Sequence, residues 1–148
     1  MTDCYEEQVV QAIVALLQAA MDAAYGVGHT VVRDYPAFDP DQVDSAGSPF
    51  VYCYEPSSDF DKSDEDYLVE LKNLLVSGLV RCTAGFTSTM QGQANNLQHV
   101  LMGAVLYNSI TVGNGVVQCI LAAPIMRQQG ENHMWVDLPL IVRIPRRD

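Results

Sequence analysis

A chain of 148 residues, 49% of them hydrophobic, is long enough to bury a core, and we expect residues 1–148 to form a single domain. The formal net charge of −10 argues against binding nucleic acid through its phosphates, or an anionic membrane surface, because both depend on Lys and Arg. The sequence predicts free thiols in a reducing cytosol, and no zinc site, for the four irregularly spaced cysteines Cys4, Cys53, Cys82 and Cys119.

The N-terminal segment predicts an amphipathic helix over residues 3–25. Its apolar residues recur at spacings of three and four, and acids in the first turn suit the helix dipole: Val9, Ile13, Leu16, Leu17, Ala20 and Ala24, with Glu6 and Glu7. Gly26 or Gly28 can end this helix. The acids stand where a secretory signal needs positive charge, and glutamines interrupt the apolar run, so we expect neither export nor a membrane span.

Two short strands follow, over residues 30–35 and 50–55. Pro36 stops the first strand. Alternation in the second places Phe50, Tyr52 and Tyr54 on one face and Val51 and Cys53 on the other.

The acidic part of the chain lies between and after these strands. Asp39, Asp41 and Asp44 fall in the loop over residues 36–49, and Asp59 and Asp61 follow Pro56. Such a run of like charge predicts solvated segments, whereas a calcium-binding EF-hand loop needs a Gly and a Glu at fixed offsets that this sequence lacks. We therefore expect no metal site here, although paired acids leave a divalent metal or general acid–base chemistry as the alternative.

Helical spacing of leucines predicts a second helix over residues 63–78, which Ser63 and Asp66 would cap. Residues 79–87 alternate as a strand with Val80 and Cys82 on its buried face. A third helix is expected over residues 93–110, before a tight turn at Gly113 and Gly115.

The C-terminal residues predict a long antiparallel hairpin. Residues 116–126 are nearly continuously apolar, and residues 135–144 alternate, with Asp137 and Arg143 on the polar side. The polar loop 127–133 would join the two strands. The order of elements indicates an α+β fold, a mainly antiparallel sheet with two or three helices packed on one face.

The residues give little support to an enzyme. Cys-His catalysis needs a thiolate near an imidazole, and the cysteines fall mainly in apolar runs, where thiols are inert. Trp135 has two open interpretations, an anchor in an interface or a cap of the hairpin against the first helix. No cofactor is expected.

Five features together resemble the tail terminator family of long-tailed bacteriophages. They are the N-terminal amphipathic helix, the DYPAF-like segment 34–38, the SPFVYCYE segment 48–55, the strand that runs into a polar turn and helix over residues 79–110, and the terminal hairpin ending in MWVDLPLIVRI at 134–144. The resemblance covers most of the chain, and residues 57–78 are longer than the family pattern needs. It implies a non-catalytic structural protein of the virion neck, assembled in the host cytoplasm.

The same resemblance implies a homohexameric ring that caps the tail tube protein and joins it to a head-completion or connector protein. An edge strand over residues 30–35 would offer backbone groups to a neighbouring subunit, and an acidic lumen would let DNA pass without binding. Candidate interaction residues are the acids Asp39, Asp41, Asp44, Asp59 and Asp61, together with Trp135, Arg143, Arg146 and Arg147. The three arginines could meet an acidic partner ring or could form a solubilising tail.

Two alternatives from other classes stay open. One is a small cytosolic hydrolase or metal-dependent enzyme that uses the acidic loops and a histidine. The other is an adaptor or chaperone that binds a peptide at its sheet edge. Measuring the mass in solution separates them, because only the ring predicts a hexamer.

Overall fold

A computed structural model describes residues 3–26, 28–29, 31–33, 49–61, 69–81, 88–106, 110–112, 115–121 and 123–145. Within these residues the chain forms two helices, α1 (Tyr5–Tyr25) and α2 (Ser88–Leu106). It also forms seven strands: β1 (Val31–Val32), β2 (Phe50–Asp61), β3 (Val69–Arg81), β4 (Ile110–Val112), β5 (Gly115–Leu121), β6 (Ile125–Gln129) and β7 (His133–Pro145).

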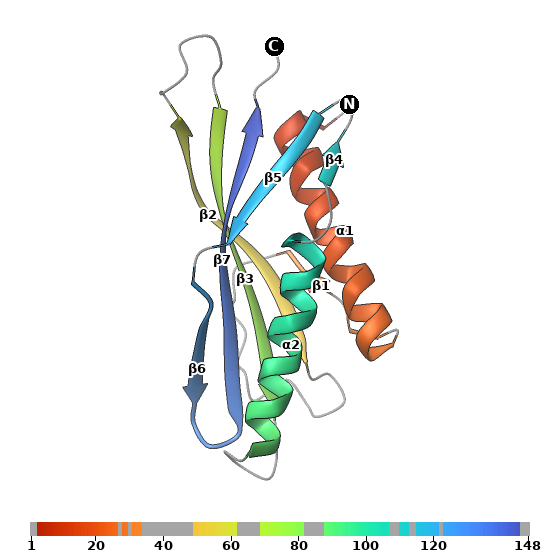
Figure 1. The fold of residues 1–148 in the computed structure, drawn as a ribbon, viewed down its shortest axis with the longest axis vertical. Coiled ribbons are helices and arrows are strands. Elements are labelled where there is room, and N and C mark those ends of the chain that lie inside the picture. The colour runs from red at the N-terminus through yellow and green to blue at the C-terminus, as the bar shows by residue number, and fades with distance from the viewer. Residues whose placement is uncertain are drawn as a thin grey trace.

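One sheet holds the strands in the order β1-β2-β3-β7-β5-β4, and β6 pairs with β7. Among the described strands only the short β1–β2 pair is parallel, and the other pairs are antiparallel. Both helices pack on the same face of the sheet (Figure 1). The predicted α+β class with a mainly antiparallel sheet is therefore confirmed.

Strand β7 is the centre of this sheet. It pairs with β3 along its whole length, from Val69↔Pro145 to Arg81↔His133. Its other edge is shared between β6, which pairs with its first half, and β5, which pairs with its second half. Every other residue of β7 from Met134 to Ile144 is buried in the main core against the helices, as the sequence predicted.

The predicted terminal hairpin is real but arranged differently. Residues 116–126 do not form one strand, because β5 ends at Leu121 and β6 begins at Ile125. The interruption lies next to Pro124, which lacks a backbone donor. Most of the expected loop 127–133 instead belongs to β6 and β7, which meet at a turn containing Gly130 at φ 64°. This positive φ suits glycine, and it allows a tighter hairpin than the sequence indicated.

The second helix predicted over residues 63–78 is wrong where the structure describes it, because Val69–Arg81 form β3. Leu74, Val76 and Val80 face the main core, while Leu79 is buried on the opposite face. A strand buried on both faces has no clean alternation, so its leucines also fit helical spacing. Residues 62–68 and 82–87, with Cys82, lie outside the described part.

Strand β2 continues past Glu55, the last residue of the predicted strand. Its pairing with β3 shifts register between Tyr54 and Ser57, so two residues of β2 oppose one of β3. Pro56 falls in this irregularity, where a missing backbone donor is tolerated. Asp59 and Asp61 therefore belong to β2 rather than to the expected acidic loop.

Helix α1 agrees with the prediction and ends at Gly26, which has φ 82°. Helix α2 begins at Ser88, five residues before the predicted start, and ends at Leu106, so that Ile110 belongs to β4. In the described part, only Val31–Val32 of the predicted strand 30–35 is a strand.

Candidate interaction surfaces

The face of the sheet opposite the helices carries its own small cluster. Tyr52, Leu79 and Trp135 are buried together there, from three neighbouring strands. The Tyr52 and Trp135 rings meet edge to face with their centroids 5.6 Å apart, which is the favoured geometry for an aromatic pair. Trp135 is only 5% exposed and does not cap the hairpin against α1.

A polar group borders this cluster. The hydroxyl of Ser77 donates a 2.6 Å hydrogen bond to Asp137, whose other carboxylate oxygen accepts from Nε of Arg127. The Arg127 guanidinium also lies over the Trp135 ring, with Cζ 5.4 Å from its centroid. The side chain of Asp137 is 12% exposed and that of Arg127 is 51% exposed, so the carboxylate is buried and its partner reaches water.

Antiparallel pairing brings these residues together. Arg127 lies opposite Trp135 in the β6–β7 pair, and Ser77 lies opposite Asp137 in the β3–β7 pair. Sequence reasoning found Trp135 and placed Asp137 on the polar side, but it put Arg127 in a loop. The alternation of β7 was enough to predict the position of Asp137. Placing Arg127 on a strand would have required knowing that the hairpin turns at Gly130.

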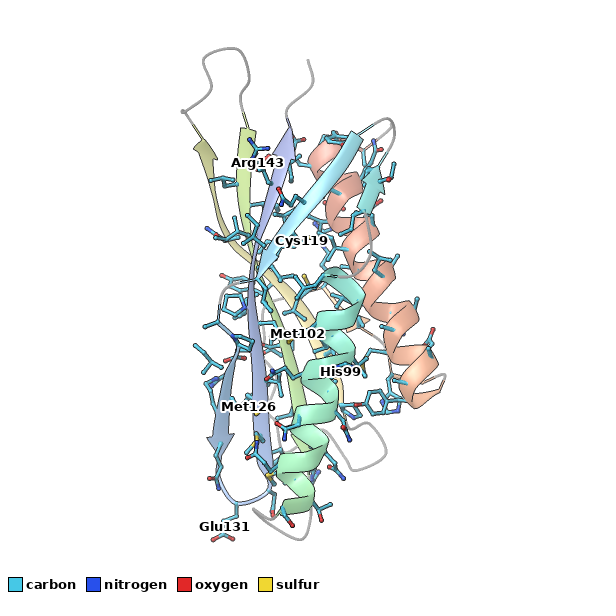
Figure 2. All side chains as sticks on the ribbon, viewed as in Figure 1. His99, Met102, Cys119, Met126, Glu131 and Arg143 are labelled. Atoms are coloured by element: carbon cyan, nitrogen blue, oxygen red, sulfur yellow. The ribbon has the colours of Figure 1, made fainter. Side chains whose placement is uncertain are left out.

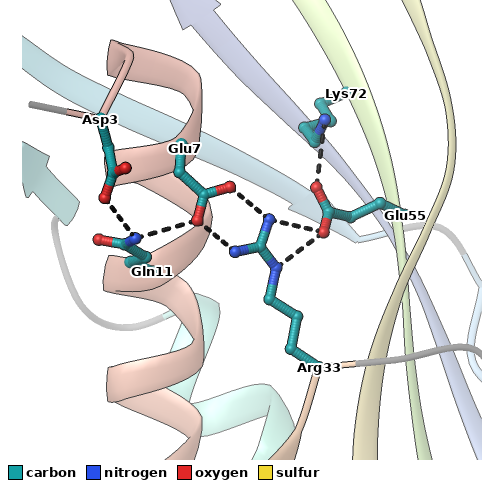
Figure 3. Close-up of polar contacts among 6 residues, drawn as sticks. All are labelled: Asp3, Glu7, Gln11, Arg33, Glu55 and Lys72. Carbon is teal, nitrogen blue, oxygen red and sulfur yellow. Dashed lines mark hydrogen bonds and ion pairs between the residues drawn. The ribbon is translucent and has the colours of Figure 1, made fainter. Parts of the chain in front are cut away.

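A second group of charges joins α1 to the β1–β2 edge (Figure 3). The Arg33 guanidinium donates to both oxygens of Glu7, and its Nε donates a 2.8 Å hydrogen bond to Glu55. Glu55 also pairs with Lys72 at 3.3 Å. Gln11 donates to Glu7 on the same helix and to Asp3, which precedes the helix. No local pattern predicted this network, because it joins positions far apart in sequence.

These contacts change the proton affinity of their members. The hydrogen bond from Arg33 lowers the pKa of Glu7. Burial alone would raise the pKa of Glu55, but hydrogen bonds from Arg33 and Lys72 lower it overall. The two carboxylates in turn raise the pKa of Arg33. Glu7, Arg33 and Glu55 are therefore ionised at neutral pH, and their contacts hold α1 to the strands.

The edge strand β1 is tied to the same helix. The Gln18 side chain accepts a 2.8 Å hydrogen bond from the backbone N–H of Val31 and donates to the carbonyl of His29. This backbone donor was expected to be available to a neighbouring subunit, but it is already used within the chain.

The structure describes four of the predicted interaction residues. Trp135 is buried, Arg143 is exposed on β7, and Asp59 and Asp61 lie in β2. Asp39, Asp41, Asp44, Arg146 and Arg147 lie outside the described residues. Asp59 and Arg143 occupy the same row of the sheet, because each pairs with Leu71.

Two of the described thiols, Cys53 and Cys119, lack the lowered pKa of a reactive nucleophile. Cys4, Cys53 and Cys119 are free, as predicted. Burial raises the pKa of Cys53 to about 12 and that of Cys119 to about 11, which favours the unreactive thiol form. In the part of the chain that the structure describes, no three His, Cys, Asp or Glu side chains form a group able to hold a metal.

Helix α1 is long and apolar enough to cross a membrane by length and composition. A core helix passes the same test. Here Val9, Ile13, Leu17 and Met21 are fully buried in the main core of the chain.

The fold as a whole has a counterpart in a phage-like particle. No protein-family model matches this sequence, and no curated protein matches it. The structure is similar to a chain of the virion of a native gene transfer agent (GTA) particle, with a TM-score of 0.59 and 17% sequence identity. The match covers 98% of this chain and 100% of that chain, so the two share one fold over their full lengths.

Proposed function

We propose that this chain is a structural protein of a bacteriophage-type virion. More specifically, we propose a tail terminator that forms a homohexameric ring, caps the tail tube and joins it to the head connector or head-completion protein. The observation that carries the proposal is the full-length similarity of fold to a chain of a virion particle. The resemblance of the helix, the strands and the C-terminal hairpin to the tail terminator family favours this role within the particle.

The charge of the chain fits such a ring. Ten of the eighteen acids lie between Asp34 and Asp66, with only Lys62 as a basic residue among them. Acids lining a channel would repel DNA phosphates and let the genome pass without binding. We propose this role, or a docking role toward the adjoining ring, for Asp39, Asp41, Asp44, Asp59 and Asp61. Arg143, Arg146 and Arg147 would face an acidic partner.

Trp135 has a different part in this proposal from the one its sequence suggested. Because it is buried, it is not available as a direct anchor. It instead supports the guanidinium of Arg127, which lies over its ring and is half exposed. We therefore propose Arg127 as the contact and Trp135 as its positioning residue.

The test is a mass measurement by light scattering, with and without assembled tail tubes, followed by electron microscopy of tube ends. A terminator gives a hexamer in solution or on the tube, and a ring of extra density at one end only. Tubes alone and the chain alone serve as controls. A monomer in both conditions, with bare tube ends, would reject the proposed function.

A further inference from the structure

Strand β6 forms an edge of the sheet and carries an arginine at its centre. Among the described strands, β6 pairs only with β7, so the other side of its backbone has no neighbouring strand. Figure 2 shows Met126 on this strand and Glu131 at the tip of the hairpin, beyond the last pair of the ladder. An open edge of this kind can pair with an extended segment of another chain, and Arg127 is the residue that such a segment meets.

The register of the hairpin places Arg127 on the face of the sheet that the helices leave open. Arg127 pairs with Trp135 and Ile125 pairs with Asp137, and these two residues of β7 alternate with those that face the main core. The Ile125 residue is 52% exposed and the Arg127 side chain is 51% exposed. Met126 lies on the other face, where the Gln91 amide of α2 donates to its sulfur. The β6 edge therefore presents an apolar side chain and a cation next to each other on the open face.

Arg33 shows how one arginine of this chain holds two carboxylates. Its Nε atom donates to Glu55, and its two Nη atoms donate to both oxygens of Glu7 (Figure 3). A guanidinium has five N–H donors in a fixed fork, so it can accommodate a carboxylate on each of two sides.

Arg127 has one such partner among the described residues. Its Nε atom donates to Asp137, and its Nη2 atom lies 3.5 Å from the other oxygen of the same carboxylate. Within the part of the chain that the structure describes, Nη1 of Arg127 makes no hydrogen bond, and half of the side chain reaches water. The Nη end, which in Arg33 holds the second carboxylate, is therefore open in Arg127.

The open end of Arg127 is held in position from behind. Its guanidinium lies over the Trp135 ring, with Cζ 5.4 Å from the ring centroid. The carboxylate of Asp137 is itself fixed by the 2.6 Å hydrogen bond from Ser77, which is fully buried. A side chain that is already fixed loses little conformational freedom when it binds, so a ligand meets a prepared site.

The charges near this edge favour an acidic partner. On the open face of the half of β7 that pairs with β6, the described charged side chains are the cations Arg81 and Arg127 and the anion Asp137, two positive charges and one negative. The row that contains Asp59 lies at Arg143, about 26 Å along β7 from Trp135, which is well beyond a screening length of about 8 Å. A strand with a carboxylate opposite Arg127 gains a pair of opposite charges, whereas a basic strand is repelled.

We propose that the outer edge of β6 binds an extended acidic segment of a partner protein as an added strand, with a carboxylate of that segment on the Nη end of Arg127. An apolar side chain two residues from that carboxylate contacts Ile125, because alternate residues of a strand share a face. The inference rests on the proposed function for Arg127 as a contact, and it adds the chemical class of the partner.

A designed peptide probes this site directly. The probe is the capped peptide Thr-Val-Thr-Glu-Thr-Val-Thr, and two matched peptides carry Gln or Lys in place of the Glu. Two-dimensional NMR of the nitrogen-15-labelled chain follows binding up to millimolar peptide, and the single tryptophan, Trp135, gives one indole N–H signal. We expect the Glu peptide to shift this signal and the backbone amides of residues 125–129. It should bind about fivefold more tightly than the Gln peptide, and the Lys peptide should bind more weakly still.

Two arginine variants locate the carboxylate. Arg127→Met removes the proposed contact, whereas Arg33→Met removes the same charge next to β1, at the other edge of the sheet. We expect Arg127→Met to bind the Glu and Gln peptides equally and Arg33→Met to keep the fivefold preference. Circular dichroism melting checks that both are folded. If Arg127→Met does not fold, the comparison of the three peptides on the parent decides alone.

Three results would overturn the site. The first is equal binding of the three peptides by the parent, or no shift at millimolar peptide. The second is a preference for the Glu peptide that Arg127→Met retains. The third is a shift of the β6 amides that grows with the concentration of the chain itself in the absence of peptide, because a second copy would then occupy the edge.

These outcomes are separable from those of the proposed function, since the peptides are added to the chain without tail tubes. Selective binding of the Glu peptide by a chain that forms no ring on tail tubes supports the β6 site and rejects the terminator. Rings on tail tubes, formed by a chain that binds all three peptides equally, support the terminator and reject the β6 site.

Discussion

Gly78 on β3 lies against Leu97 of α2, where there is no room for a larger side chain. A Cβ at this position would lie 2.5 Å from Cδ2 and 3.2 Å from Cγ of Leu97. We expect Gly78→Ala to lower the free energy of unfolding by about 1–3 kcal/mol, because the leucine must leave its packed position. Urea denaturation of Gly78→Ala, Leu97→Val and the double variant checks this. If the double variant loses as much unfolding free energy as the two single variants together, the contact between Gly78 and Leu97 is not responsible.

The Arg127–Asp137 pair predicts an asymmetry. Arg127→Met leaves a largely buried carboxylate with Ser77 as its remaining partner, whereas Asp137→Asn leaves a cation that already reaches water. Removing the partner of a buried charge is the more damaging change. We expect Arg127→Met to lower the free energy of unfolding by about 1–3 kcal/mol, and Asp137→Asn by less. Chemical denaturation at neutral pH measures both, and the reverse order would contradict this assignment.

At the level of elements, β7 carries most of the sheet. Leu140 is 1% exposed in the main core, and Arg143, three residues on, is exposed. We expect deletion from Trp135 onward, or Leu140→Asp, to abolish folding. The burial free energy lost with these side chains, or the cost of burying a charge at position 140, would exceed a total free energy of unfolding of about 5–15 kcal/mol. Arg143→Asp on the same strand is the control and should remain folded. A cooperative melt of the Leu140→Asp variant would show that β7 is peripheral.

The network of Glu7, Arg33 and Glu55 makes the attachment of α1 depend on pH. The pKa values of both glutamates are lowered in the folded chain. Their contribution to the free energy of unfolding is therefore complete above the pKa of the unfolded chain, about 4.3, and is lost as pH falls through the lower pKa values of the folded chain. Arg33→Met removes that contribution, which solvent screening limits to about 1 kcal/mol. We expect the stability difference between the parent and this variant to shrink below about pH 4. Thermal melts across pH 3–7 measure it, and a constant difference would contradict the assignment.

The same elements show how far the sequence could predict the structure. The alternation of β7 could be predicted because the side of this strand that faces the helices is uniformly apolar. Strand β3 was misread because Leu79 is buried on one face and Val80 on the other. The predicted strand ended at Glu55, since the sequence does not reveal that β2 continues through a register shift at Pro56. The pairing of Arg33 with Glu7 and Glu55 depends on tertiary contacts that leave no periodic signal.

On the scale of the whole molecule, the separation of charge along the chain fits the ring that we propose. Acids concentrated before Leu71 repel one another, which lowers the stability of the isolated chain at low salt. A chain that retains such repulsion gains from it only if the acidic side faces something, such as a DNA channel or a neighbouring ring.

Removing the charge of five of these acids tests their proposed role. We expect the variant with Asp39, Asp41, Asp44, Asp59 and Asp61 all changed to Asn to stay folded, and to be slightly more stable than the parent at low salt, because self-repulsion falls. Joining of tails to heads, or passage of DNA, should be impaired, since both would depend on the removed charge. The control changes Asp22 to Asn and Glu131 to Gln, which removes exposed acids outside this stretch. Stoichiometric binding of calcium or magnesium by the parent, lost in the five-site variant together with an enzymatic activity, would reject the structural role. It would favour a metal-dependent hydrolase instead.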